Sequence, residues 1–183
     1  MLEYRHLGGL DNTRLNDYKS VMTTSAHLLR HLHLQQPPDP ANRAWISILV
    51  VAHGLKAVSE QLFREYGITG QQYNVLRILR GAGDGGMSCS CIAERVIDRD
   101  PDITRLLDRL ERAGHIERWR NPADRRSVRA RLKPSGQALV DGIDQPLAQL
   151  QTQVFTTIPP SDQKQLAALL DSMIGALYYP SPE

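Results

Sequence analysis

The sequence has 183 residues, with 22 Lys and Arg against 20 Asp and Glu and a hydrophobic content of 41%. This length suits one compact domain with an attached helical arm, and the hydrophobic content is sufficient for a core. No run of eighteen apolar residues occurs, and the N-terminus lacks the apolar segment of a secretory signal. We therefore expect no membrane contact and a cytoplasmic location.

The charge is unevenly distributed along the chain. Between Arg99 and Lys133 there are eleven Lys and Arg and six Asp and Glu, so this stretch carries +5 and the rest of the chain −3. Such a concentration of positive charge indicates a polyanionic partner, although a solvated basic face would have the same composition.

The first 41 residues are predicted to form a helical arm. Apolar side chains recur at helical spacing over residues 13–34, and the Pro-rich segment 35–40 then interrupts the helix. The arm contains His27, His31 and His33, of which the first two are one helical turn apart. A pair at this spacing can share a metal ion, but no carboxylate or cysteine supports it, so we expect no metal site.

Two helices are predicted to follow the arm. The first covers residues 42–66 with a broad apolar stripe, and Gly67 is in the position that commonly ends a helix. Thr69 and Gln72 then have the spacing of a capping box, which starts the second helix. The loop 81–86 is rich in glycine but lacks the Lys and Ser or Thr of a phosphate-binding loop, so we expect no nucleotide there.

The next two short helices, joined by a tight turn, are predicted to form a helix-turn-helix. Ser88 is predicted to cap the first helix, which runs to Val96. Asp100 is predicted to cap the second, with Pro101 at its first position and Gly114 as its stop. Apolar residues occupy one face of this second helix, and the other face carries Thr104, Arg105, Asp108, Arg109 and Arg112.

A β-hairpin is predicted directly behind the helix-turn-helix, which makes it a wing. Its strands cover about residues 116–119 and 127–132. An arginine on a thin hairpin can enter the minor groove of DNA, where the negative potential is enhanced. Asp124 and Arg126 are spaced so that the carboxylate can hold the guanidinium, which leaves Arg120 and Arg125 for backbone phosphates.

Two long helices are predicted after Pro134. The first reaches about residue 157 with Pro146 inside it, and Ser161 is predicted to cap the second. Both carry a long apolar stripe that has no partner in the small winged unit. Burial in a homodimer, together with the helix over 42–66, accounts for these stripes.

The predicted fold is therefore mainly α with a small β-hairpin wing, a winged helix-turn-helix with long N- and C-terminal dimerisation helices. We expect an N-terminal arm over 1–41, a DNA-binding domain over 67–133, and a dimerisation region made of 42–66 and 134–179. We do not expect an enzyme, because the chain has no nucleophile elbow, no metal-ligand string and no dinucleotide loop.

Three stretches together resemble the MarR family of winged-helix transcriptional regulators: ITGQQYNVLRIL, MSCSCIAERV and ITRLLDRLERAGHIERWRNPADRRSVRARLKPSG. The resemblance implies a homodimer that binds a pseudo-palindromic operator in double-stranded DNA, commonly as a repressor released by a small, often phenolic effector. It implies no required cofactor. By position, Thr104, Arg105 and Arg109 would face the major groove, and Asp124 and Arg126 would be the wing pair. Lys133 replaces the usual threonine cap of the helix that follows.

Several alternatives stay open. Cys89 and Cys91 lie at a predicted helix N-terminus, which favours thiolate, so they act either as redox sensors or as small packing residues. Trp45 and His53, on the helix over 42–66, either line an effector pocket or pack in the core. A winged helix used for protein contacts, without a specific operator, is a further alternative to a DNA-binding regulator. A steep fall of DNA affinity with salt distinguishes these two, because phosphate contacts release counterions.

Overall fold

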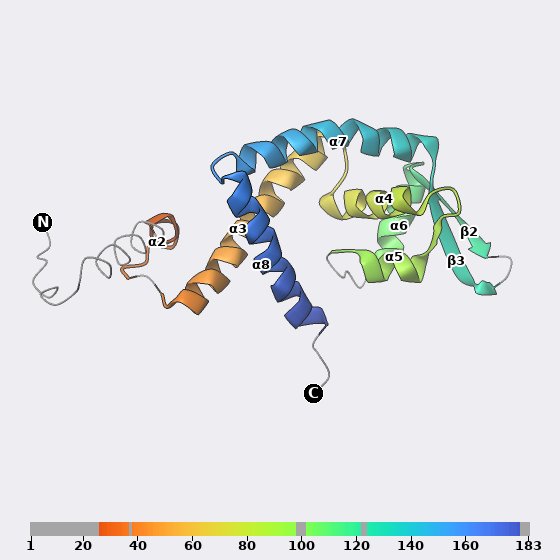
Figure 1. Cartoon of the computed structure of the whole chain (residues 1–183). Helices are drawn as coiled ribbons and strands as arrows, with labels where there is room; N and C mark the ends of the chain where they lie inside the picture. The colour runs from red at the N-terminus through yellow and green to blue at the C-terminus, as the bar shows by residue number, and fades with distance from the viewer. Residues whose placement is uncertain (1–25, 37, 98–101, 122–123, 180–183) are drawn as a thin grey trace, which may run out of the picture. The chain divides into compact units, whose positions relative to one another are not determined.

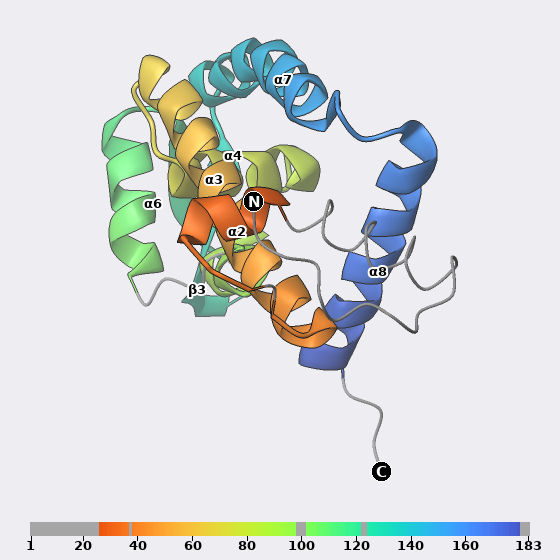
Figure 2. The same ribbon diagram turned by 90° about the vertical axis from the view of Figure 1, so that its left-hand side faces the viewer.

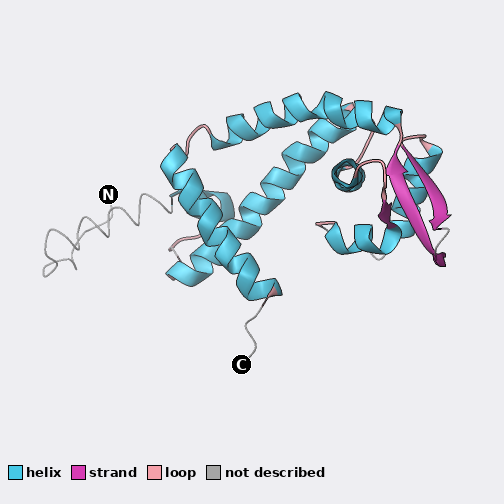
Figure 3. Ribbon diagram, turned by 45° about the vertical axis from the view of Figure 1, so that its right-hand side comes forward, coloured by secondary structure: helices cyan, strands magenta, loops and turns pink. Residues whose placement is uncertain are grey.

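The computed structural model describes residues 26–36, 38–97, 102–121 and 124–179. Its elements make a mainly helical protein with a small sheet, as predicted (Figures 1 and 3). In chain order they are α2 (Ala26–Leu32), α3 (Pro40–Glu65), α4 (Gly70–Ala82), β1 (Met87–Ser88), α5 (Cys89–Arg95), α6 (Ile103–Arg112), β2 (Ile116–Asn121), β3 (Asp124–Leu132), α7 (Pro134–Phe155) and α8 (Pro160–Tyr178).

The chain divides into two compact units, residues 1–55 and 56–183, and the division falls inside α3. In the first unit, the helix predicted over 13–34 is present as α2, while residues 13–25 lie outside the described residues. The predicted interruption before α3 is confirmed. Asp39 begins α3, because its carboxylate Oδ1 accepts hydrogen bonds from the N–H groups of Ala41 and Asn42, each at 3.1 Å.

The passage from α3 to α4 follows the predicted signals. Gly67 has φ 72° and ends α3, and the N–H of Ile68 donates to the carbonyl of Phe63 at 3.1 Å. Thr69 and Gln72 then form the predicted capping box. The Gln72 N–H donates to Thr69 Oγ1 at 3.2 Å, and the Thr69 N–H donates to Gln72 Oε1 at 2.9 Å.

The core of the second unit lies between α4, α5, α6, the sheet and the first half of α7. Complete burial of an aliphatic side chain contributes about 1.5–3 kcal/mol to stability, so the fully buried side chains of this core hold the helix-turn-helix together. α7 runs above α4 in Figure 1 and contacts it, and its Val140 and Ile143 close the core. The largest fully buried side chains are Val75, Leu76, Leu79, Ile92, Leu107, Leu110, Ile116, Val140 and Ile143.

The sheet is antiparallel with strand order β1-β3-β2. The predicted hairpin is β2 and β3, whose register pairs Ile116 with Leu132. The strand β1 was not predicted, because two residues are too few to show the period-2 pattern of a strand. It pairs Met87 with Ala130, and Gly86 makes this possible with φ 60° and a close approach to β3.

Two predicted helix caps are wrong. The cap of α6 is Asp102 and not Asp100, because Oδ1 of Asp102 accepts the Arg105 N–H at 3.3 Å; residues 98–101 lie outside the described residues. Ser161 does not cap α8. Pro159 is at the cap position and Pro160 at the first helical position, where its fixed φ suits a helix.

The start of α7 agrees with the sequence. Lys133 is at its cap position and makes no capping hydrogen bond through its side chain, as the replacement of threonine implied. The helix then continues through Pro146 to Phe155.

Candidate nucleic-acid interface

The solvent side of α6 is the first part of the candidate interface. Leu106, Leu107 and Leu110 are buried and fix the helix in the unit, as the apolar spacing predicted. Figure 2 shows α6 from its side. On its outer face the structure brings together four exposed residues, Thr104, Arg105, Arg109 and Arg112. Arginine on such a face can donate two hydrogen bonds to guanine or one or more to phosphate.

Asp102 has two functions at the start of α6. It caps the helix and so stabilises its N-terminus, and its Oδ2 lies 3.0 Å from Nε of Arg105. The Arg105 side chain is nevertheless 76% exposed, so the ion pair orients the guanidinium without removing it from the surface. An ion pair this exposed adds little stability.

Asp108 does not lie with the exposed basic residues, contrary to the prediction. It turns toward β2, where its Oδ1 lies 2.5 Å from Nη2 of Arg118. The carboxylate of Glu111 binds the same guanidinium, with Oε2 at 2.6 Å from Nη2. These hydrogen bonds, that of Glu111 first, raise the pKa of Arg118 above its ordinary value. The partner of Arg118 was not predicted, because the sequence does not show which acidic residue a strand arginine meets.

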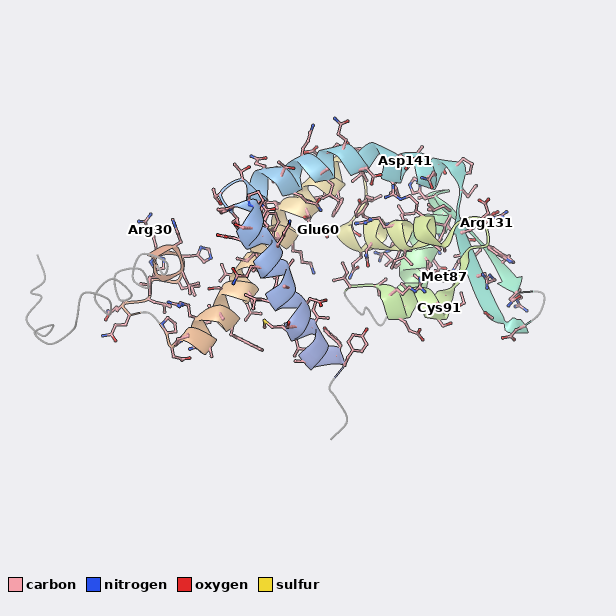
Figure 4. The ribbon with its side chains drawn as sticks, in the orientation of Figure 1. Arg30, Glu60, Met87, Cys91, Arg131 and Asp141 are labelled. Carbon is pink, nitrogen blue, oxygen red and sulfur yellow. The ribbon has the colours of Figure 1, made fainter. Side chains whose placement is uncertain are left out.

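The base of the wing is fixed by two further arginines. Nη2 of Arg129 donates to the carbonyls of Gly85 and Gly86, each at 2.9 Å, which joins β3 to the loop before β1. Arg131 binds Glu117 across the hairpin, and its guanidinium carbon lies 5.5 Å from the ring centre of Trp119 (Figure 4). Arg118, Arg129 and Arg131 are therefore bonded within the protein, and none of them is among the residues predicted to contact DNA.

The tip of the wing carries the remaining predicted residues. Arg120 is exposed, and Asn121 pairs with Asp124 next to the turn. Arg125 and Arg126 lie in β3, but their side chains are outside the described residues, as are residues 122–123. The predicted pair between Asp124 and Arg126 therefore stays a prediction.

A helix with an exposed basic face beside a basic hairpin is the arrangement of a winged helix-turn-helix. The sequence model of the MarR family matches residues 68–128. The chain is 31% identical over 135 residues to YkoM, an uncharacterized HTH-type transcriptional regulator of Bacillus subtilis, and the match spans 72% of this chain and 86% of YkoM. The chain belongs to the MarR family. It is a DNA-binding transcriptional regulator and not an enzyme.

Two other similar proteins cover most of the same residues. The homoprotocatechuate degradative operon repressor of Escherichia coli is 26% identical over 130 residues, with 71% of this chain and 86% of the repressor matched. The structure of S. aureus MepR in complex with DNA has a TM-score of 0.66 and 23% identity, and the match covers 72% of this chain and 96% of that chain. The winged-helix fold predicted from the sequence is confirmed.

The two cysteines of this MarR-family chain differ in environment. Cys91 is exposed on α5 (Figure 4), whereas Cys89 is half-buried. Burial raises the pKa of the Cys89 thiol, which opposes the thiolate that the helix N-terminus was predicted to favour. The packing interpretation is the better one for Cys89, and the redox interpretation of the pair stays a prediction.

The predicted effector residues lie on the exposed part of α3. Trp45 is 61% exposed and His53 is exposed as well, so neither packs in a core within the described part of the chain. His27 and His31 of α2 line an open cavity of about 610 Å³ together with Val50 and Val51 of α3. No group of three or more His, Cys, Asp or Glu that could hold a metal ion occurs within residues 26–36, 38–97, 102–121 and 124–179.

The apolar character of α3 exceeds the sequence expectation. Over 26 residues, with a mean hydropathy of 1.3 in its most apolar window, it is long and apolar enough to cross a membrane by length and composition. A helix that buries an apolar face against a protein partner has the same length and composition. Membership of the MarR family favours the protein partner over the membrane.

Proposed function

We propose that this regulator binds a pseudo-palindromic operator as a homodimer, represses transcription there, and is released by a small organic effector. In this proposal Thr104, Arg105 and Arg109 contact bases and phosphates in the major groove. The wing enters the adjacent minor groove with Arg126, which Asp124 holds, while Arg120 and Arg125 contact phosphates. In this proposal the protein acts in the cytoplasm.

The observation that carries this proposal is the asymmetry of α6. One face is buried as deeply as any part of the core, and the other exposes arginines without any apolar side chain between them. A helix fixed in this manner can enter the major groove as a rigid body. MepR, a protein of the same fold, has been solved with DNA, which supports the same use of the fold here.

A homodimer is proposed because α3 and α8 both expose apolar side chains. No residue of α8 is buried, although it is a helix of 19 residues. Apolar area of this extent is typical of a protein interface. Residues 42–66 and 134–179 would form the dimerisation region around the DNA-binding domain 67–133, with the arm 1–41 added to it. The exposed apolar residues are Trp45, Leu49, Val51 and Val58 on α3, and Leu166, Leu169, Met173, Ile174 and Leu177 on α8.

The oligomeric state can be tested on α8 by light scattering. Leu169 is 59% exposed, so a charge at this position does not disturb the core of one chain. Leu169→Glu is expected to give a monomer, because a carboxylate buried in an apolar interface costs several kcal/mol. Gln165→Glu, which adds the same charge on the same helix, is the matched control. A monomeric wild-type protein would contradict the homodimer.

Members of the MarR family typically bind small-molecule ligands. We propose an aromatic effector, often phenolic in this family, beside Trp45 and His53. A panel of phenols and aromatic carboxylates can be screened by thermal unfolding, since a ligand that binds only the folded state raises its stability. Loss of the response in Trp45→Ala, with unchanged DNA binding, would support this location.

The deciding experiment is selection of random duplex DNA by the full chain at two salt concentrations. An inverted repeat with half-sites about one helical turn apart, flanked by A·T-rich DNA, is expected. Arg109→Ala and Arg126→Ala should each weaken binding by about 1–3 kcal/mol while the dimer stays folded, as for loss of a specific contact. Arg64→Ala, an exposed arginine near the end of α3, is the matched control. Normal binding by Arg126→Ala would refute the wing assignment, and salt-insensitive binding would refute the DNA interface.

A further inference from the structure

We infer that Arg118 is a positioning residue, which joins the wing to α6 so that the two contact DNA at one fixed spacing. The inference rests on the proposed function, in which α6 and the wing occupy neighbouring grooves. It assigns to Arg118 no contact with DNA.

The geometry of Arg118 is that of a link between two elements. It lies on β2, opposite Ala130, on the same face as the buried Ile116. Nη2 lies 2.5 Å from Asp108 Oδ1 and 2.6 Å from Glu111 Oε2, and Nε donates to Glu111 Oε2 at 2.9 Å. Its backbone N–H donates to Glu111 Oε1 at 3.1 Å. One strand residue therefore makes four hydrogen bonds to two side chains of α6.

The environment makes this link stronger than a surface ion pair. The side chain of Arg118 is only 20% exposed, and those of Asp108 and Glu111 are 33% and 37% exposed. A guanidinium that binds through several N–H groups fixes direction as well as distance, which an ammonium group does not. By contrast, Arg131 is bonded to Glu117 within the hairpin and does not reach α6 through that bond.

The position of the link makes it effective at the tip of the wing. Arg118 is three residues from Asn121, which pairs with Asp124 beside the turn, and this corresponds to about 10 Å of strand. A rotation of about 20° at the base would therefore displace this end of the wing by about 3.5 Å, close to the rise of one base pair. A change of this size in the angle between α6 and the wing would thus change which base-pair step the wing meets.

The experiment compares two duplexes with the full-length protein. The first is the duplex selected by the wild type, and the second has one base pair inserted between each half-site and its A·T-rich flank. Dissociation constants are measured by fluorescence anisotropy for the wild type, Arg118→Lys and the matched control Arg131→Lys. The wild type and the control should bind the second duplex about tenfold more weakly, as for one misplaced contact. Arg118→Lys should lose most of this discrimination, to about threefold or less, and bind the first duplex more weakly.

Two results with these duplexes would overturn the inference. One is that Arg118→Lys keeps the full tenfold difference in affinity between the two duplexes. The other is that the wild type binds both duplexes equally well. The triple variant Arg118→Met, Asp108→Asn, Glu111→Gln removes the ionic bonds and leaves no charge at three positions that together carry −1 in the wild type. Normal discrimination by this variant would show that Arg118 acts only by neutralising the two acids, and would overturn positioning. Circular dichroism checks that each variant is folded, and a wild type that selects no operator would refute the proposed function instead.

Discussion

Replacement of Gly86 by alanine tests how the base of the wing is built. Gly86 has φ 60°, and a Cβ at this position would lie 2.3 Å from the carbonyl oxygen of Ala130 and 2.8 Å from the Trp119 ring. The left-handed backbone costs alanine about 1–2 kcal/mol, and an overpacked methyl group costs about 1–3 kcal/mol. The oxygen belongs to β3 and cannot move without opening its pairing with β1. Gly86→Ala is therefore expected to lower the free energy of unfolding by about 2–5 kcal/mol.

A second glycine separates the two contributions. Gly83 has φ 63°, but a Cβ there would meet no atom within 4 Å. Gly83→Ala should therefore show the backbone cost alone, about 1–2 kcal/mol. Both variants can be compared with the wild type by urea unfolding followed by circular dichroism, with the free energy taken from midpoint and slope. Equal losses in the two variants would refute the steric reasoning at Gly86.

Three further predictions concern single side chains. Asp102→Ala should lower the free energy of unfolding by about 1 kcal/mol, because it removes the cap of α6. Asp102→Asn should lower the free energy of unfolding by less than half as much, because asparagine also caps helices. Urea unfolding that finds Asp102→Asn to be the less stable variant would contradict the capping role. The hydrogen bond from Arg80 lowers the pKa of Asp144, so the stability it adds is present above the ordinary value of 3.8 and is lost as pH falls through the lowered pKa. The acid-induced loss of stability, measured by thermal unfolding at decreasing pH, should be smaller in Arg80→Met. Cys91 should react with iodoacetamide well before Cys89, which is half-buried and has a raised pKa; equal labelling rates by mass spectrometry would contradict this difference.

Elements with a strong local signal were predicted well from the sequence. The capping box at Thr69 and Gln72 and the stop at Gly67 are short-range hydrogen-bond patterns, and the residues that form each of them lie within five positions of one another in the chain. The buried face of α6 followed from its apolar spacing in the same manner. At Ser161 the local rule failed, because a preceding proline had already set the helical backbone.

The candidate site was predicted in part. The exposed residues of α6 were identified from their spacing, since helical periodicity determines which side chains share a face. The strand β1 and the partners of Arg118 and Arg129 were missed. These depend on contacts between residues 7 to 44 positions apart in the chain, which no local pattern encodes.

The missed contacts change the meaning of the basic stretch between Arg99 and Lys133. Its net charge of +5 indicated either a polyanionic partner or a solvated basic face, and charge alone does not show which arginines are available. Arg118 and Arg131 bind three carboxylates, those of Asp108, Glu111 and Glu117.

This pairing moves negative charge away from the outer face of α6. Arg105, Arg109 and Arg112 remain there without those three carboxylates beside them. The acids of this basic stretch, which would repel phosphate on an unfolded chain, thus become the groups that orient its helix and its wing. The variants Arg118→Lys and Gly86→Ala test this arrangement, since the first loosens the wing from α6 and the second loosens it from β1.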